Sequence, residues 1–427
     1  MKKIHVSPLN GCLKKISVPG DKSISHRAVI IGSLAKGVTK IYDFLEAEDT
    51  LNTIKVYKQI GVKIEKKGQT YDVYGKGLFS SREPKKELYV GNSGTAIRLT
   101  LGVLAAQNFK SVITGDAQII KRPMNRVIIP LSEMGARFES NNGFAPITVQ
   151  GGSLKGIKYR MEMPSAQVKS AIILAAIHAG NPTEITEDVK SRDHTERMLK
   201  HFGAKIKITD KKIVITPGGF KSNVVYVPGD ISSAAYFIAA GAIMKNSRIT
   251  ILNVGLNPTR TGIIDVLKKM GAKIKIKNLK IKNNEPVGDV LITTSKLKGI
   301  TIKGDIIPRV IDEIPIISIL AAYADGKTVI SDASELRVKE TDRIFSIVRN
   351  LRRIGIKVEE KKDGMIIHGN GGKPFKYVDI DSFGDHRIAM AFSIAALVSD
   401  NGLLIKDTEC VNTSFPEFFD ILKELKR

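Results

Sequence analysis

The hydrophobic positions of the chain recur in one pattern six times. In each copy a Ser or Asp precedes an apolar, Ala-rich run that ends near a Gly or Asn, and consecutive copies start roughly 70 to 80 residues apart. Helices that are apolar on all sides are buried, so each copy predicts a buried helix. The copies begin at Ser23, Ser93, Ser165, Ser232, Asp312 and Asp385.

A second phrase predicts how each unit continues. Gly is favoured just after a helix C-terminus. The phrase "LKKMGAKI" at 267–274 therefore predicts the end of a helix, a Gly and the beginning of a strand. The phrase recurs at 57–64, 131–138, 199–206 and 351–358. Each unit is therefore predicted to run helix, strand, loop, helix, strand, strand.

The two ends of the chain predict how the units are shared between domains. The sixth unit stops after its second helix, and the N-terminal "LKKISVPGDKS" resembles "SNVVYVPGDIS", which precedes the fourth unit. We expect residues 1–20 to complete the last unit, so that 1–20 and 229–427 form one domain and 21–228 the other. The fold class is α/β (α+β), and the cleft between two such domains is the expected ligand site.

Composition narrows the class of protein. The formal net charge of +24 is compatible with binding to nucleic acid, acidic lipid or small anions. Nucleic acid is disfavoured, because 6% aromatic residues and no Trp leave few side chains on which bases could stack. Cys12 and Cys410 form no CxxC pair, which fits a reducing compartment without disulfides or thiolate zinc. No apolar stretch reaches the roughly 18 residues of a membrane span, and no secretory signal precedes the first unit. We expect a soluble, cytoplasmic protein.

The polar starts of the buried helices carry the candidate chemistry. A helix N-terminus offers unpaired N–H groups and the positive end of the helix dipole to an anion. Arg can grip a carboxylate or phosphate with two hydrogen bonds, and Lys supplies a point charge. Singly, each cation could form a surface ion pair, and Ser23 or Ser25 could simply cap a helix. The cations at these starts or in nearby loops are Lys22, Arg27, Arg122, Lys339, Arg343 and Arg387.

Two acids lie close to these cations in the sequence. In "SELRVKETDRI" at 334–344, Lys339 and Arg343 share a face if the stretch is helical, with Glu340 beside them. A carboxylate flanked by cations can act as a base, although the stretch could also be a solvated, salt-bridged helix start. The second acid, Asp312 in "VIDEIPI", could serve chemistry or cap a helix.

Several motifs, taken in order, resemble one family. "PGDKSISHRA", "GNSGTAIR", "KRPM", "SAQVKSA", "RVKETDR" and "DHRIAMAF" are similar to the motifs of the 5-enolpyruvylshikimate-3-phosphate (EPSP) synthase family, the 3-phosphoshikimate 1-carboxyvinyltransferases. The resemblance implies two similar domains, each of three βαβαββ units with buried helices, an inside-out α/β barrel. It also implies a shikimate-pathway transferase, on the route to chorismate and aromatic amino acids.

The resemblance implies a reaction. The enolpyruvyl group passes from phosphoenolpyruvate to the 5-hydroxyl of shikimate 3-phosphate by addition and elimination, and phosphate is released. No metal and no organic cofactor is implied. We expect a monomer that binds these two small molecules and neither nucleic acid nor a membrane.

The resemblance also implies residue roles. Asp312 activates the 5-hydroxyl, and Glu340 with Lys22 moves the proton on carbon. Three positions depart from other members, since Ala166 replaces a Ser, His194 a Tyr and Thr413 a phosphate-binding Lys. The shikimate 3-phosphate site is expected at Lys22, Ser23, Arg27, Ser165, Ala166, Gln167, Ser191, Asp312 and Lys339. The phosphoenolpyruvate site is expected at Lys22, Asn92, Gly94, Arg122, Gln167, Arg343, His386 and Arg387.

Two alternatives compete with this hypothesis. The related UDP-N-acetylglucosamine enolpyruvyl transferases have Lys–Asn where this chain has Lys22–Ser23, and a Cys in a loop that reads "GDAQIIKRPMN" here, without Cys. A non-catalytic polyanion-binding protein would interleave exposed cations with aromatic residues. Asp312 and Glu340 would instead repel a polyphosphate.

Overall fold

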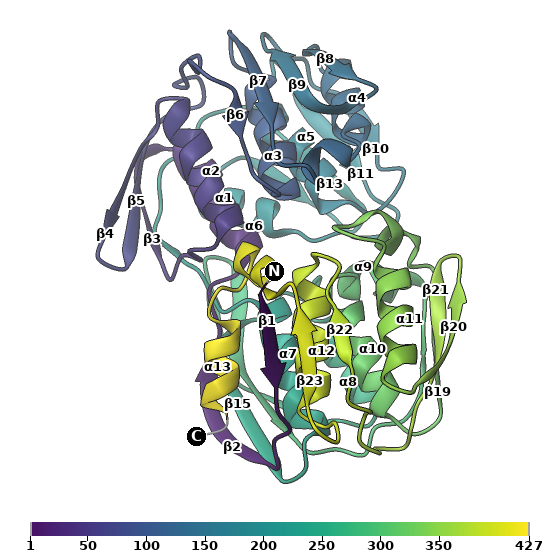
Figure 1. Cartoon of the computed structure of the whole chain (residues 1–427). Helices are drawn as coiled ribbons and strands as arrows, with labels where there is room; N and C mark the ends of the chain where they lie inside the picture. The colour runs from purple at the N-terminus through teal and green to yellow at the C-terminus, as the bar shows by residue number, and fades with distance from the viewer. Residues whose placement is uncertain (1, 426–427) are drawn as a thin grey trace. The chain divides into compact units, whose positions relative to one another are not determined.

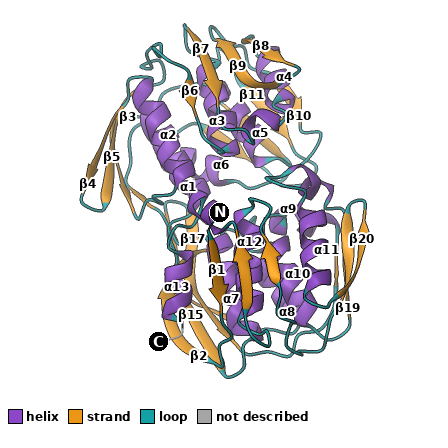
Figure 2. Cartoon of the chain, viewed as in Figure 1, coloured by secondary structure: helices purple, strands orange, loops and turns teal. Residues whose placement is uncertain are grey.

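The computed structural model describes residues 2–425, and their contacts divide them into two compact units. Unit 1 comprises Met1–Pro19, Pro228–Lys280 and Pro286–Arg427, and unit 2 comprises Gly20–Val227 and Ile281–Glu285. Among the described residues, each unit contains three sheets, with apolar helices between them (Figure 1, Figure 2).

The three sheets of unit 2 have one arrangement of strands. The strands are β3 (Lys36–Tyr42), β4 (Lys63–Lys67), β5 (Thr70–Lys76), β6 (Leu88–Tyr89), β7 (Lys110–Thr114), β8 (Arg137–Asn141), β9 (Phe144–Gln150), β10 (Lys158–Arg160), β11 (Thr183–Thr186), β12 (Ile206–Ile208), β13 (Lys212–Ile215) and β14 (Val225–Tyr226). Their orders are β14-β3-β5-β4, β6-β7-β9-β8 and β10-β11-β13-β12. The first two strands of each sheet are parallel, and the remaining neighbours are antiparallel.

Two sheets of unit 1 have four strands, as in unit 2, and the third has three among the described residues. The strands are β1 (Lys3–Val6), β2 (Cys12–Ser17), β15 (Ser247–Gly255), β16 (Lys273–Lys282), β17 (Glu285–Thr293), β18 (Thr301–Ile302), β19 (Lys327–Ile330), β20 (Lys357–Lys361), β21 (Gly364–His368), β22 (Asp379–Asp381) and β23 (Leu403–Lys406). Their orders are β16-β17-β15-β2, β18-β19-β21-β20 and β1-β23-β22. The pairs β2–β15, β18–β19 and β22–β23 are parallel.

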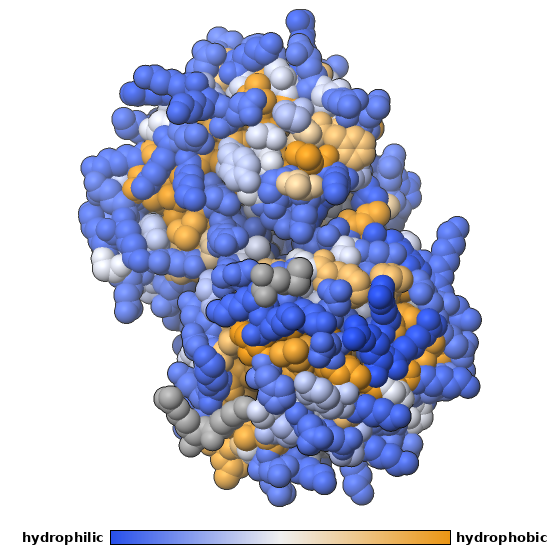
Figure 3. Space-filling model, in the orientation of Figure 1, coloured by the Kyte–Doolittle hydropathy of each residue, from blue (hydrophilic) through white to orange (hydrophobic). Residues whose placement is uncertain are grey.

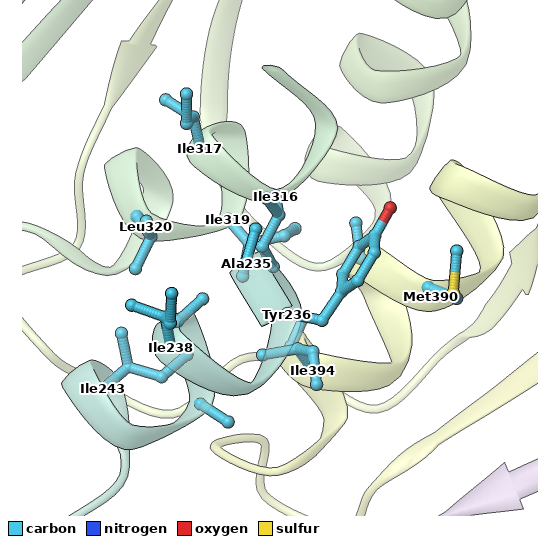
Figure 4. Close-up of a cluster of buried hydrophobic side chains, with 14 of the residues drawn as sticks. Ala235, Tyr236, Ile238, Ile243, Ile316, Ile317, Ile319, Leu320, Met390 and Ile394 are labelled. Carbon is cyan, nitrogen blue, oxygen red and sulfur yellow. The ribbon is translucent and has the colours of Figure 1, made fainter. Parts of the chain in front are cut away.

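Six apolar helices form the two cores, as the repeated pattern predicts. They are α1 (Lys22–Leu34), α3 (Gly94–Leu104), α5 (Ala166–Ala176), α7 (Ile231–Ile243), α10 (Ile314–Tyr323) and α12 (His386–Ala396). Every residue of α7 is buried, and Figure 4 shows apolar side chains of α7, α10 and α12, among them Tyr236, Ile316 and Ile394, in the core of unit 1. Polar residues cover most of the face shown in Figure 3, and the lysines of β16 are mostly exposed.

The second helices end where the sequence predicts. They are α2 (Glu48–Gln59), α4 (Asn125–Glu133), α6 (His194–His201), α8 (Gly262–Lys269), α11 (Arg343–Arg353) and α13 (Phe418–Glu424). The glycines that follow the first five all have positive φ, at 92°, 116°, 82°, 91° and 91° for Gly61, Gly135, Gly203, Gly271 and Gly355. A side chain would strain this backbone. The shorter helices are α9 (Ile307–Val310) and the 3₁₀ turns η1 (Ile119–Lys121), η2 (Gly304–Ile306), η3 (Ser334–Val338) and η4 (Thr408–Thr413).

The N-terminal segment is divided between two sheets. β1 lies antiparallel to β23 and supplies one of the two strands that the sixth repeat lacks. β2 instead lies parallel to β15, in the sheet of the fourth repeat. β14, which leads into the fourth repeat, pairs with β3 of the first repeat. The expectation that residues 1–20 complete the last unit therefore describes β1 but not β2.

No helix within residues 2–425 has both the length and the apolar composition that crossing a bilayer requires.

Candidate active site

The starts of the three apolar helices of unit 2 are joined by side-chain hydrogen bonds. Arg27, on α1, donates from Nη2 to Ser170 Oγ of α5 at 2.9 Å. Gln167, on α5, accepts from Arg98 Nη1 of α3 at 2.7 Å and donates to Thr95 Oγ1 at 3.0 Å. These bonds bring together residues of three motifs that lie far apart in the sequence, among them the predicted residues Arg27 and Gln167.

The first two turns of α1 hold Lys22 and Arg27. Asp21 caps this helix, because its Oδ1 accepts from the backbone N–H of Ile24 at 2.9 Å. The cap is therefore neither Ser23 nor Ser25. Lys22 Nζ lies 3.0 Å from Asp49 Oδ2 at the start of α2.

The guanidinium of Arg27 is buried and makes two further bonds. It donates from Nε to Thr195 Oγ1 at 2.7 Å and from Nη1 to the carbonyl of Ser23 at 3.0 Å. Through these bonds Arg27 is fixed against α6 and against its own helix, so its position is set before any ligand binds.

The start of α3 carries the residues predicted to bind phosphoenolpyruvate. Ser93 caps the helix, and Gly94 is its first residue. Asn92 bridges two side chains, because its Nδ2 donates to Gln118 Oε1 at 2.6 Å and its Oδ1 accepts from Arg122 Nη2 at 3.1 Å. A Cβ on Gly94 would lie 3.1 Å from Arg122 Nη1, so this glycine leaves room for the guanidinium.

Ser165 and Ser191 occupy two different settings. Ser165 caps α5 by accepting from the N–H of Val168 at 3.4 Å, and Ala166 is the first residue of the helix. Ser191 lies between β11 and α6, and its hydroxyl donates to Glu187 Oε1 at 2.5 Å. His194, the other departure in this segment, lies 2.7 Å from Glu285 Oε1 through its Nδ1.

In unit 1 two acids and two arginines converge at the starts of α10, α11 and α12. Asp312 lies just before α10, and its Oδ1 is 3.5 Å from Arg343 Nη1 while its Oδ2 is 3.7 Å from Arg387 Nη2. Its carbonyl accepts from Arg387 Nη1 at 3.0 Å. Glu340 Oε2 is 2.5 Å from Arg343 Nη2, so all four predicted residues belong to one cluster.

Both arginines of this cluster keep their charge. Burial alone would lower the pKa of Arg343, but Asp385 and Glu340 outweigh it and raise that pKa above its usual value. Burial is likewise outweighed at Arg387, whose pKa is raised chiefly by Asp312. Permanently charged guanidiniums beside a carboxylate can hold an anionic substrate while the carboxylate accepts a proton.

The condition on which Lys339 and Arg343 would share a face is not met in the segment 334–344. The segment is not one helix, because η3 ends at Val338 and α11 begins at Arg343, where Asp342 caps it by accepting from the N–H of Phe345 at 3.0 Å. Lys339 lies between the two helices with its Nζ 3.6 Å from Glu335 Oε2. Lys339 and Arg343 therefore do not share a helix face.

The position of the missing lysine is occupied by a polar pair. Thr413 Oγ1 lies 3.5 Å from Nδ1 of His386, the first residue of α12, and donates to the carbonyl of Cys410 at 2.8 Å. His386 is buried. At this place unit 1 has an imidazole and a hydroxyl as hydrogen-bonding groups instead of an ammonium.

Several residues of these clusters were missed in the sequence. Asp385 stands in the motif "DHRIAMAF" and Arg98 in the motif "GNSGTAIR". Neither is among the residues predicted to form the site. Asp49, Gln118, Ser170, Thr195 and Glu187 give no local signal, because their partners are 18 to 168 residues away. Within residues 2–425, no group of three or more His, Cys, Asp or Glu side chains is placed to hold a metal ion.

In each unit, cations paired with carboxylates at helix starts are suited to binding small anionic substrates. Comparison with known proteins agrees with this class. The profile of EPSP synthase (3-phosphoshikimate 1-carboxyvinyltransferase) matches residues 6–422. The chain belongs to the EPSP synthase family, and the predicted transferase class is confirmed.

Individual relatives match along the whole chain. The 3-phosphoshikimate 1-carboxyvinyltransferase of Petrotoga mobilis is 53% identical, with 99% of each chain covered. That of Bacillus subtilis is 49% identical, with 100% of each covered. The EPSP synthase structure from Acinetobacter baumannii has a TM-score of 0.89 at 43% identity, covering 100% of this chain and 98% of that one. These matches confirm the predicted α/β fold class.

Proposed function

We propose that the residues at the helix starts of unit 2 and the acids and arginines of the unit 1 cluster carry out the reaction of this family. In that reaction the enolpyruvyl group of phosphoenolpyruvate is transferred to the 5-hydroxyl of shikimate 3-phosphate, and phosphate is released. The observation that carries the proposal is the position of Asp312, whose two carboxylate oxygens face Arg343 and Arg387. This arrangement supplies a base next to two fixed cations in unit 1.

The cations of both units bind the charges of the substrates. Each substrate has a phosphate and a carboxylate, so together they bring about six negative charges near neutral pH. Arg122, Arg343 and Arg387 hold phosphoenolpyruvate, with hydrogen bonds from Asn92, Gln167 and His386 and with the backbone at Gly94. Shikimate 3-phosphate is held by Lys22, Ser23, Arg27, Ser165, Gln167, Ser191 and Lys339, beside Ala166.

The acids move the protons. Glu340 and Lys22 deliver a proton to the methylene carbon of phosphoenolpyruvate, and Asp312 takes the proton of the 5-hydroxyl as its oxygen bonds to the adjacent carbon. The tetrahedral product of this addition carries its phosphate against the guanidiniums and helix starts, which stabilise the charge. Removal of a proton from the methyl carbon then expels phosphate and restores the double bond.

The proposal includes a monomer that acts in the cytoplasm. Small soluble substrates need neither a membrane nor a macromolecular partner. Size-exclusion chromatography with light scattering tests the oligomeric state independently of activity.

Phosphate release from phosphoenolpyruvate tests the reaction. The purified protein is assayed with shikimate 3-phosphate, with UDP-N-acetylglucosamine, and without an acceptor. We expect release only with shikimate 3-phosphate. Release with UDP-N-acetylglucosamine alone would assign the chain to the other branch of enolpyruvyl transferases, and no release with either acceptor would overturn the proposal.

A further inference from the structure

A fully buried lysine of unit 2 lies just behind the residues predicted to bind shikimate 3-phosphate. Lys169 is on the first turns of α5, four residues after Ser165, and its side chain is inaccessible to solvent. Its ammonium has three acceptors, Glu196 Oε1 at 2.7 Å, Glu187 Oε2 at 2.8 Å and the carbonyl of Ser191 at 3.4 Å. An ammonium has three hydrogens, so each of them has an acceptor.

Glu187 connects this lysine to Ser191. One carboxylate oxygen of Glu187, Oε2, accepts from Lys169. The other, Oε1, accepts from the hydroxyl of Ser191 at 2.5 Å and from its backbone N–H at 3.3 Å. The N–H, the carbonyl and the hydroxyl of Ser191 are thus all held by Lys169 and Glu187.

The surrounding backbone makes this side-chain support important. Residues 187–193 lie between β11 and α6 and form neither helix nor strand (Figure 1). Regular hydrogen bonding therefore does not set the position of Ser191. Glu187, Lys169 and Ser191 are all buried, so their bonds are not exchanged with bulk water and hold the segment against α5.

We propose that Glu187 and Lys169 are positioning residues for shikimate 3-phosphate, which hold Ser191 at a fixed distance from the Ser165–Gln167 start of α5. This inference rests on the proposed role of Ser191 in binding that substrate. Glu187 and Lys169 do not touch the substrate themselves. They act by fixing one side of its site before it binds.

The pair Glu187 and Glu196 provides a matched experiment. Both are buried carboxylates that accept from Lys169, but only Glu187 also accepts from Ser191. A Gln at 187 cannot accept from Lys169 and Ser191 with both ends of its side chain, because one end is an N–H donor. A Gln at 196 can keep its oxygen on Lys169, since Glu196 Oε2 has no hydrogen-bond partner among the described residues.

The effect is measured as the Kd of shikimate 3-phosphate by calorimetry and as the KM of both substrates. We expect Glu187→Gln to weaken shikimate 3-phosphate binding at least about tenfold, the scale of a lost hydrogen bond to a charged group, with the KM of phosphoenolpyruvate within twofold. Glu196→Gln should change the Kd of shikimate 3-phosphate and the KM of phosphoenolpyruvate by less than twofold each. In a Ser191→Ala background, Glu187→Gln should add nothing further.

Each other outcome overturns the inference. Equal losses in Glu187→Gln and Glu196→Gln would mean that the cluster only stabilises the fold. Tighter binding by Glu187→Gln would mean that Glu187 competes with the substrate for the Ser191 hydroxyl hydrogen. Full additivity with Ser191→Ala, or an unchanged Kd in Ser191→Ala itself, would remove Ser191 as the route of the effect.

Two features keep the test decisive. If Glu187→Gln does not fold, Glu187→Asp retains a negative charge in the cluster but is too short to reach both Lys169 and Ser191, and the same comparison with Glu196→Gln applies. Failure of the proposed function appears in the unsubstituted protein as a lack of acceptor-dependent phosphate release. Failure of the positioning role appears only in the comparison of variants.

Discussion

Arg343 Nε donates to Asp385 Oδ2 at 2.7 Å, and both side chains are almost completely buried. The same carboxylate caps α12, since its Oδ1 accepts from the backbone N–H of Arg387 at 2.8 Å. Asp385 therefore orients the side chain of Arg343 and fixes the helix start that bears Arg387, the two arginines of unit 1 that we propose bind phosphoenolpyruvate. The arrangement explains how the like charges of Arg343 and Arg387 are held close together.

Replacement of Asp385 separates these two tasks. Asp385→Asn keeps a cap acceptor but removes the charge beside Arg343, whereas Asp385→Ala removes both. We expect Asp385→Asn to raise the KM of phosphoenolpyruvate about tenfold and to destabilise the protein by about 3 kcal/mol, the lower end for a broken buried pair, because Glu340 and Asp312 remain. Asp385→Ala should cost about 1 kcal/mol more.

Denaturant unfolding and steady-state kinetics check this prediction. Equal stability of the Asn and Ala variants would contradict the capping role of Asp385. An unchanged KM in Asp385→Asn would show that Arg343 does not need this carboxylate for its position.

The acids of the unit 1 cluster should affect turnover more than binding. Asp312→Asn and Glu340→Gln preserve shape but lose the ability to exchange a proton, which contributes about 10²- to 10⁴-fold in typical enzymes. We expect kcat to fall at least about 100-fold, with both KM values within threefold. Asp420→Asn, at an exposed ion pair with Lys423, is the control and should be unchanged. Equal losses in kcat and in substrate affinity would contradict the assigned roles.

A methyl group at Gly94 should disturb the arginines around it. Its Cβ would lie 2.9 Å from Arg98 Nη1 and 3.1 Å from Arg122 Nη1, so both guanidiniums must move. We expect Gly94→Ala to raise the KM of phosphoenolpyruvate at least about fivefold, because small misplacements of binding groups are costly, with little change in the thermal midpoint. Gly152→Ala, where the added Cβ meets open space, is the control. A KM unchanged by Gly94→Ala would place the phosphoenolpyruvate site elsewhere.

His26 should make the protein sensitive to acid. It is buried on α1 with its Nδ1 2.7 Å from Thr53 Oγ1, and burial, reinforced by Lys22 and Arg27, holds its pKa well below the usual value. The folded protein then binds this proton less readily than the unfolded chain. The stability contributed by neutral His26 is complete above about pH 6.5 and is lost as the pH falls below it.

Thermal unfolding between pH 7 and pH 5 checks the sign. His26→Gln can keep a hydrogen bond to Thr53 but has no proton to take up, so its midpoint should fall less across this range than that of the starting protein. The free energies of unfolding of the two proteins should diverge by at most about 1.4 kcal/mol per pH unit. His5→Gln, at an exposed histidine, serves as the control. Identical pH profiles for the His26 variant and the starting protein would contradict the prediction.

The repeated helices and their terminal glycines could be predicted because each depends on local physics. An apolar run predicts burial, and a Gly after a helix predicts a positive φ, which holds at Gly61, Gly135, Gly203, Gly271 and Gly355. The pairing of β2 with β15 could not be predicted in this way. The segments before α1 and α7 share the stretch "VPGD", and this shared sequence does not indicate which sheet each segment joins.

The partners of the site residues were equally out of reach. Lys22, Asp312 and Arg343 stand in recognisable motifs, but the bond from Arg27 to Thr195 spans 168 residues and leaves no periodic trace. The segment 334–344 misled because alternating charges suit a helix surface, whereas Asp342 starts a new helix there by capping it. The Asp342 cap, and not the local charge pattern, decides where this helix begins.

The central claim is that some cations bind shikimate 3-phosphate and others bind phosphoenolpyruvate. Two variants that each weaken the binding of one substrate test this claim most directly. Lys339→Gln and Arg122→Gln each remove one charge, and KM values for shikimate 3-phosphate and phosphoenolpyruvate are measured by phosphate release. The account predicts that Lys339→Gln raises the first at least about tenfold and the second less than threefold, and that Arg122→Gln does the reverse. Parallel rises of both KM values in both variants would contradict it.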